Sequence, residues 1–230
     1  MRGKEKEMDK KIILFSLLIF FFLLNNSIFA VGAEFKIEDI VNKQLAIENF
    51  QVDIELEILV YQGQNSKFLF TYFYQKPDKV HLETEDFVLL PKGAAETLQP
   101  NFFHPARFYH RYLGTKDEFH LFELTPKEEQ KKYRLILWVD PEAKLLKQAE
   151  MFFTIENHRE ELAVQIDYGQ IEGYSLPVFV RGKLAVPTKF GMYGEVKETQ
   201  EGSFTLKLSN YKIDTVFPSA VRQKLTSPAP

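Results

Sequence analysis

The strongest structural signal in the sequence is the stretch FQVDIELEILV, residues 50–60. Apolar side chains stand at every second position from Phe50, and acidic or amide side chains stand between them as far as Glu57. Because successive side chains of a strand point to opposite faces, this alternation predicts a long strand with one buried and one solvated face. The stretch therefore predicts a sheet with one strongly apolar face.

The flanking residues extend this strand into a larger unit. Residues 35–49 carry apolar side chains near helical spacing and predict one amphipathic helix. Residues 62–66 contain Gly63 and Asn65, which is typical of a hairpin turn, and they lead into a second strand at residues 67–75. That strand is apolar on both sides, with Phe70 and Tyr72 on one and Phe73 on the other. Such a strand must be covered on both faces or must line a cavity on one of them.

The rest of the chain continues as a series of predicted strands. These are residues 80–83, 87–90, 119–124, 133–140, 145–155, 162–168, 178–184 and 204–213. Turn residues such as Gly169, Gly173 and Pro187 separate them, and no helical period of convincing length follows Asn49. Because parallel strands would need helices between them, the pattern predicts one antiparallel sheet that curls strongly. We expect a mainly β fold with an N-terminal helix.

The segment from Pro91 to Gly114 differs from this pattern. It contains three prolines and several bulky aromatic residues, and it lacks strand alternation. We expect a short helix and a loop that cover an opening of the sheet. The lid residues predicted in this segment are Phe102, Phe103, Phe108 and Tyr112.

The N-terminus has the pattern of a secretory signal. Basic residues, among them Arg2, Lys10 and Lys11, precede an apolar run at residues 12–24 that is short for a membrane span. Small residues follow, and cleavage is expected after Ala30 or Ala33, with an uncleaved membrane anchor as the alternative. We expect a signal peptide at residues 1–33, one domain at 34–225 and a disordered tail at 226–230. The protein is then periplasmic or otherwise extracytoplasmic.

Composition excludes several classes of function. The chain has 29 Lys and Arg residues against 32 Asp and Glu residues, a net charge of −3, so it lacks the basic field of a nucleic-acid-binding protein. It has no cysteine, which excludes disulfides, thiolate metal sites and a Cys nucleophile. Its five histidines show no regular metal spacing, and there is no nucleophile elbow, P-loop or dinucleotide motif. We therefore expect no catalytic residue, no metal and no cofactor.

Several motifs, taken in order, resemble a known family. They are the N-terminal signal, a helix ending at Asn49-Phe50, a long strand and hairpin, then KPDKVHL at 76–82, LILWVDP at 135–141, LLKQA at 145–149 and SNYKI at 209–213. This order resembles the LolA-like superfamily, whose members are periplasmic carriers and receptors of outer-membrane lipoproteins. The resemblance covers about residues 35–217.

The resemblance implies an eleven-stranded antiparallel half-barrel closed by helices, with an apolar concave face that takes up acyl chains. It implies a monomeric cell-envelope carrier whose partners are lipids or lipoproteins. Two features depart from the family: residues 91–114 are longer than the corresponding segment, and no arginine stands on the helix or first strands, where the carriers use one to tie the lid shut. Without cysteine, the chain cannot be an outer-membrane lipoprotein receptor.

The alternation also predicts which residues would line a binding face. Polar residues such as Asp53 cannot lie under a helix or line an apolar cavity without partners, so the apolar set must face inward. The predicted lipid-binding residues are Val52, Ile54, Leu56, Phe70, Tyr72, Leu137 and Met151. Two alternatives stay open. The same side chains could fill a compact core, or the scaffold could serve as an envelope sensor that binds a membrane partner by its surface.

Overall fold

The computed structural model describes residues 36–60, 64–84, 96–128, 133–154, 160–190 and 196–226. Residues 37–230 form one compact unit, and the description below concerns that unit. The predicted signal peptide, the strand predicted at 87–90 and the tail after residue 226 lie outside the described residues. No helix within the described ranges is long and apolar enough to cross a membrane.

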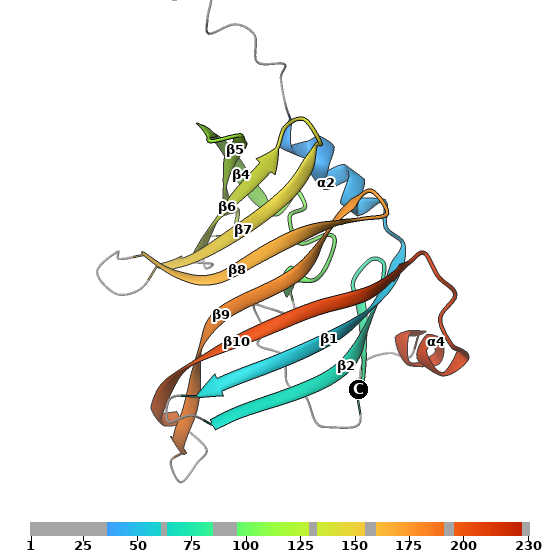
Figure 1. The fold of residues 1–230 in the computed structure, drawn as a ribbon, viewed down its shortest axis with the longest axis vertical. Coiled ribbons are helices and arrows are strands. Elements are labelled where there is room, and N and C mark those ends of the chain that lie inside the picture. The colour runs from blue at the N-terminus through green and yellow to red at the C-terminus, as the bar shows by residue number, and fades with distance from the viewer. Residues whose placement is uncertain are drawn as a thin grey trace, which may run out of the picture. The chain divides into compact units, whose positions relative to one another are not determined.

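One antiparallel sheet of ten strands dominates the fold (Figure 1). Its strands are β1 (Asn49–Val60), β2 (Gln64–Gln75), β3 (Lys79–Glu83), β4 (Phe108–Lys116), β5 (Phe119–Pro126), β6 (Tyr133–Asp140), β7 (Leu145–Thr154), β8 (Glu160–Ile171), β9 (Tyr174–Phe190) and β10 (Val196–Ile213). The strand order is β3-β2-β1-β10-β9-β8-β7-β6-β5-β4. The sheet is curved and stays open, with β3 and β4 as its edges. The predicted mainly β half-barrel is confirmed.

The two halves of the sheet are joined by the pairing of β1 with β10. Every other neighbouring pair of strands is consecutive in the chain, whereas β1 and β10 come from opposite ends of the domain. Their register places Phe50 opposite Ile213 and Leu56 opposite Leu206. The predicted hairpin is confirmed as well, since β1 and β2 pair from Asn49–Gln75 to Val60–Gln64.

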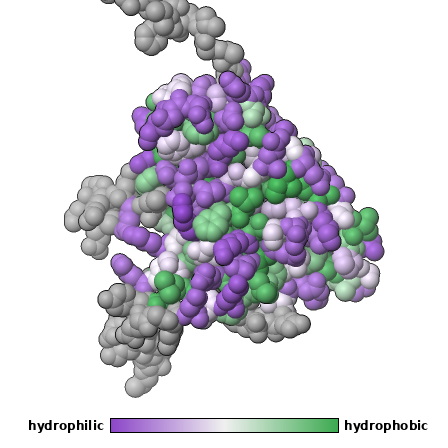
Figure 2. All heavy atoms as spheres, viewed as in Figure 1, coloured by the Kyte–Doolittle hydropathy of each residue, from purple (hydrophilic) through white to green (hydrophobic). Residues whose placement is uncertain are grey.

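Alternation in β1 separates an apolar face from a polar face. Val52, Ile54 and Leu56 are fully buried, while Asp53 and Glu55 between them lie on the outer face. There Glu55 binds Lys67 of β2 at 2.8 Å and Lys207 of β10 at 3.1 Å. Hydrophilic residues cover most of the surface seen in Figure 2, with hydrophobic residues in patches between them. The apolar face is therefore the inner, concave one.

Among the described residues, helices α2 and α4 lie against the sheet; the sequence predicted α2 and did not predict α4. Helix α2 (Ile37–Leu45) buries its apolar side, and Gln44 Nε2 donates a hydrogen bond of 2.6 Å to the Ser175 carbonyl on β9. Helix α4 (Ser219–Thr226) packs Val221 and Leu225 against Phe73 of β2. The sequence shows no helical period of convincing length after Asn49 and did not predict α4. This second helix explains how β2 can be apolar on both faces.

Strand β4 also corrects the sequence analysis. Residues 91–114 were expected to form a short helix and a loop without strand alternation, but Phe108–Lys116 is an edge strand that pairs with β5 from Phe108–Pro126 to Lys116–Phe119. Strands β3 and β4 follow each other in the chain and yet form the two opposite edges of the sheet. The connection between them must therefore cross the sheet from one edge to the other.

Candidate functional site

A continuous row of side chains crosses the concave face from β2 to β4. Each member lies directly opposite the next in the strand register, so all project from the same face. The row consists of Phe68, Leu56, Leu206, Val180, Ile166, Ala149, Leu137, Phe122 and Tyr112. From Leu56 to Phe122 these side chains are at most 4% exposed, whereas Tyr112 at the β4 edge is 51% exposed. The face is apolar across its whole width and opens toward solvent at β4.

All seven predicted binding residues lie buried on this face. Five of them, Val52, Ile54, Leu56, Phe70 and Tyr72, form one group on β1 and β2, where Ile54 pairs with Phe70 and Val52 with Tyr72. The other two, Leu137 on β6 and Met151 on β7, form a second group. Strands β10, β9 and β8 lie between the two groups. The predicted set therefore spans the face and does not form one cluster.

The segment before β4 covers the middle of the face. Phe102 and Phe103 are buried and make an edge-to-face contact with ring centroids 4.9 Å apart. Phe103 also lies 6.3 Å from Tyr168 on β8, and Phe108 lies 6.0 Å from Phe102. Three of the four predicted lid residues thus form one aromatic cluster over the sheet.

Tyr112, the fourth predicted lid residue, lies elsewhere. It belongs to strand β4, where its ring contacts Phe122 at 5.3 Å and its hydroxyl lies 2.9 Å from the Thr115 hydroxyl. Half of its surface remains exposed. Tyr112 was predicted together with the phenylalanines because the sequence of this segment shows no strand alternation. The strand instead carries Tyr112 to the open edge.

Helix α2 and residues 96–107 contact the sheet outside its ladder, through side chains and through one backbone hydrogen bond of 2.9 Å from Lys127 N–H to the Arg107 carbonyl. His110 Nε2 of β4 lies 3.2 Å from Glu38 Oε1 of α2, and Gln44 of α2 binds the β9 backbone. In the crossing segment, the Arg107 guanidinium stacks over the Phe102 ring at 5.6 Å. Separating α2 and residues 96–107 from the sheet would leave the pairing of the ten strands in place.

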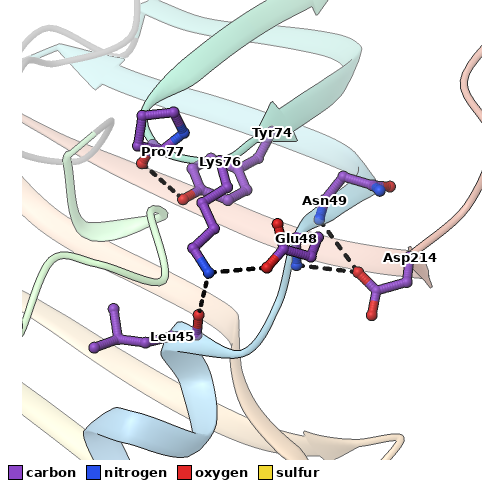
Figure 3. A network of polar contacts seen from close by, with 7 residues as sticks. All are labelled: Leu45, Glu48, Asn49, Tyr74, Lys76, Pro77 and Asp214. Carbon is purple, nitrogen blue, oxygen red and sulfur yellow. Dashed lines mark hydrogen bonds and ion pairs between the residues drawn. The ribbon is translucent and has the colours of Figure 1, made fainter.

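A polar network ties the end of α2 to the sheet (Figure 3). Lys76 Nζ donates to the Leu45 carbonyl at 3.1 Å and to Glu48 Oε1 at 2.9 Å. The Asp214 carboxylate accepts hydrogen bonds from the backbone N–H groups of Glu48 and Asn49. A lysine on the last carbonyls of a helix is a favourable C-terminal partner. This network holds the C-terminal end of α2 against the start of β1 and the end of β2.

Aromatic hydroxyls supply most of the polarity beneath the cover. Tyr74 donates to the Pro77 carbonyl at 2.9 Å, and burial, with the nearby Asp78 and Glu48 carboxylates, raises the pKa of Tyr74 to about 12. Burial also raises the pKa values of Tyr72, Tyr168 and Tyr211. All four phenols therefore stay neutral at physiological pH. Of these four tyrosines only Tyr72 was predicted to line the face. Tyr168 ends a strand with the same apolar alternation, so that alternation could have predicted it as well.

Charged groups suited to catalysis do not gather on this face. Within the described ranges, no three His, Asp or Glu side chains lie close enough to hold a metal ion. The carboxylates of β1 lie on the outer face. What the concave face offers to a ligand is apolar surface and a few neutral hydroxyl groups.

Comparison with known proteins identifies the fold. No protein-family model and no curated protein matches the sequence. A DUF1329 family protein from Desulfovibrio piger superposes with a TM-score of 0.53 at 11% identity, over 84% of this chain and 97% of that chain. A domain described as that of an outer membrane lipoprotein-sorting protein, from Vibrio parahaemolyticus, gives 0.51 at 9% identity, over 81% and 95%. A LolA superfamily protein from Nitrosomonas europaea gives 0.49 at 16% identity, over 86% and 99%.

These likenesses concern the fold alone, because the identities are low. The fold is LolA-like, as the order of motifs in the sequence predicted. The resemblance implied eleven strands, and the described residues form a sheet of ten.

Proposed function

We propose that this LolA-like chain is an extracytoplasmic carrier that shelters the acyl chains of lipids or lipoproteins on the concave face of its sheet. The observation that carries the proposal is the unbroken apolar row from Leu56 to Phe122, which no charged side chain interrupts. Removing an acyl chain from water is favourable by about 0.8 kcal/mol per methylene group. A face of this width can therefore hold one or more chains if its cover moves aside.

The cover supports the proposal in a second way. In this structure the concave side chains are buried against α2 and the aromatic cluster of Phe102, Phe103 and Phe108, so the apolar face is closed. Helix α2, Phe102 and Phe103 lie outside the sheet ladder, whereas Phe108 is the first residue of β4 and pairs with Pro126. An acyl chain would replace the contacts that these elements make, and the apolar surface would stay out of water in both states.

The proposal is tested by binding of a fluorescent fatty-acid probe. Phe70→Leu, on the concave face, should weaken probe binding several-fold while the protein stays folded. The matched control is Leu69→Ala on the same strand, because Leu69 points to the outer face and is 67% exposed; it should leave binding unchanged. Lipid extraction and mass spectrometry of the protein purified from its own host should identify acyl-containing cargo. If the wild type binds no probe and carries no lipid, the concave face is a filled core and the carrier proposal fails.

An envelope sensor remains the second candidate because of the β4 edge. Tyr109, Tyr112 and Leu113 are exposed there, on a strand whose outer side has no neighbour in the described sheet. Exposed apolar residues on an open edge favour the addition of a strand from a partner. Under this function, Tyr109→Ser with Leu113→Ser should abolish capture of an envelope membrane protein while probe binding stays intact. Capture that survives this double change would exclude a sensor acting through β4.

A further inference from the structure

Three tyrosines from distant parts of the chain meet on the concave face. Tyr72 of β2 and Tyr211 of β10 both pack against the Phe50 ring, at 5.8 and 5.7 Å. The Tyr211 hydroxyl donates a hydrogen bond of 2.6 Å to the Pro177 carbonyl of β9, and Pro177 is the register partner of Tyr168 on β8. The shared contacts with Phe50 and Pro177 place the three tyrosines beside one another, and Tyr168 and Tyr72 also contribute to the raised pKa of Tyr211.

Two of these hydroxyls lack a partner. Tyr72 is 1% exposed and Tyr168 is 8% exposed. In the part of the chain that the structure describes, neither the Tyr72 nor the Tyr168 hydroxyl makes a hydrogen bond. A buried hydroxyl without a partner costs about 1–3 kcal/mol. Phenylalanine would fill the same space without that cost, so two unpartnered phenols in one apolar face indicate a ligand that pairs with them.

The surroundings define the chemistry of that ligand. Burial is the sole cause of the raised pKa of Tyr168 and the leading cause for Tyr72, so both phenols remain neutral hydrogen-bond donors. The rings of Phe50 and Phe103 lie beside them. An ionised carboxylate would have to lose its hydration in this apolar setting, whereas a neutral carbonyl loses much less. A carbonyl oxygen also has two lone pairs and can accept from two donors.

We infer that Tyr72 and Tyr168 form a polar anchor that binds the neutral carbonyl oxygen of an acyl ester or amide, with the hydrocarbon tail lying along the apolar row. The inference rests on the proposed function and deepens it by naming the class of cargo. The anchor lies toward the end of the face where Gln44 of α2 meets Ser175 of β9. The tail then extends toward Leu56 and Phe204, farther along the same face.

The test compares three ligands that share one hydrocarbon chain length, methyl laurate, lauric acid and n-dodecane, each displacing a fluorescent probe. The wild type should bind the ester most tightly. Tyr72→Phe combined with Tyr168→Phe should weaken ester binding by about ten- to a hundredfold, because two hydrogen bonds are lost. Alkane binding should not change, because the apolar contacts remain.

Two controls separate the anchor from general effects on the fold. Tyr211→Phe removes a hydroxyl that already has the Pro177 carbonyl as partner, so it should lower the melting temperature without altering the order of ligand affinities. Tyr109→Phe, at an exposed position, should change neither the melting temperature nor the order of ligand affinities. The Tyr72 and Tyr168 changes should leave the melting temperature of the unliganded protein unchanged or raised.

The outcomes distinguish the inference from the function beneath it. If the double variant keeps the wild-type preference for the ester, or if it loses alkane and ester binding equally, the anchor is wrong while the carrier function stands. A lowered melting temperature with an unchanged ligand preference would assign the two hydroxyls to an internal water and would also overturn the anchor. If the wild type binds none of the three ligands, the carrier function fails and the anchor fails with it.

Discussion

The two faces of the same sheet are built on different principles. On the concave face, the row from Leu56 to Phe122 is buried and apolar, and its contacts join strands that are far apart in sequence. On the outer face, Glu55 holds Lys67 and Lys207 in contacts that stay open to solvent. Burial of apolar surface stabilises a fold by kilocalories per side chain, whereas exposed ion pairs contribute little. The difference indicates that the concave face contributes most of the stability, and it is this face that the proposed function uses for binding.

The largest effect should come from truncation on the concave face. Leu56→Ala removes a fully buried side chain at the join of β1, β2 and β10 and should lower the free energy of unfolding by about 3 kcal/mol. Leu69→Ala, on the outer face of the neighbouring strand, should lower it by less than about 0.5 kcal/mol. Urea unfolding measures both. Equal losses would contradict the distinction between the two faces.

The next effect should come from a glycine on the concave face. A Cβ at Gly182 of β9 would lie 2.6 Å from the Phe204 ring and 2.7 Å from the Ala163 carbonyl oxygen. Because the backbone oxygen cannot move aside easily, Gly182→Ala should cost about 2 kcal/mol in thermal or urea unfolding. At Gly169 the added Cβ would meet only the side chain of Val178, which can rotate. A Gly169→Ala variant as unstable as Gly182→Ala would argue against this explanation.

A smaller and pH-dependent effect belongs to the patch under α4. Burial lowers the pKa of His81 below its usual 6.5, Lys224 lowers it further, and Glu83 opposes them. Because the folded state disfavours the protonated ring, the protein has its full stability above pH 6.5, where His81 is neutral in both the folded and the unfolded state. Stability is lost as the pH falls from 6.5 toward the lower pKa of the folded state. The melting temperature should therefore drop on acidification from pH 7.5 to about 5.5.

His81→Leu should flatten this part of the pH profile, because the uncharged side chain does not titrate. Lys224→Met should flatten it less, since burial remains the larger cause of the shift. An unchanged slope in His81→Leu would show that other groups cause the loss of stability in acid.

The smallest effect should come from the outer ion pairs. Hydrogen bonds from Lys67 and Lys207 lower the pKa of the Glu55 carboxyl, so their contribution to stability is lost as the pH falls through that lowered pKa. Glu55→Gln should destabilise the protein slightly in low salt and not at all in high salt, where the charges are screened. Urea midpoints at two ionic strengths measure this. A loss that persists in high salt would mean that Glu55 acts through packing.

Local patterns in the sequence were sufficient to predict most strands of the sheet. The alternation from Phe50 to Val60 and the Gly63 turn predicted β1, the hairpin and the identity of the buried face, because side-chain direction in a strand follows directly from position. Strand β4 was missed for the opposite reason. This strand forms an edge of the sheet, and most of its side chains, including Tyr112, are exposed on either face. Its sequence therefore does not alternate between apolar and polar residues.

Helix α4 was missed because it is short and weakly amphipathic. Only Val221 and Leu225, one helical turn apart, are buried, and their partner is Phe73 of a distant strand. A helix of this length has little stability of its own and depends on packing. The apolar outer face of β2 indicated that a cover was needed, but it did not indicate which segment would provide one.

By itself the sequence determined the strands of β1 and β2, their buried faces and the order of motifs that predicts a LolA-like fold, because these depend on spacing along the chain. Only the tertiary structure decided which strands became neighbours. The pairing of β1 with β10 brings Tyr72 beside Tyr211, and the pairing of β8 with β9 brings Tyr168 to the same place. Spacing cannot predict such a meeting, because it depends on contacts between strands that are remote in the chain. The proposed anchor belongs to that second category.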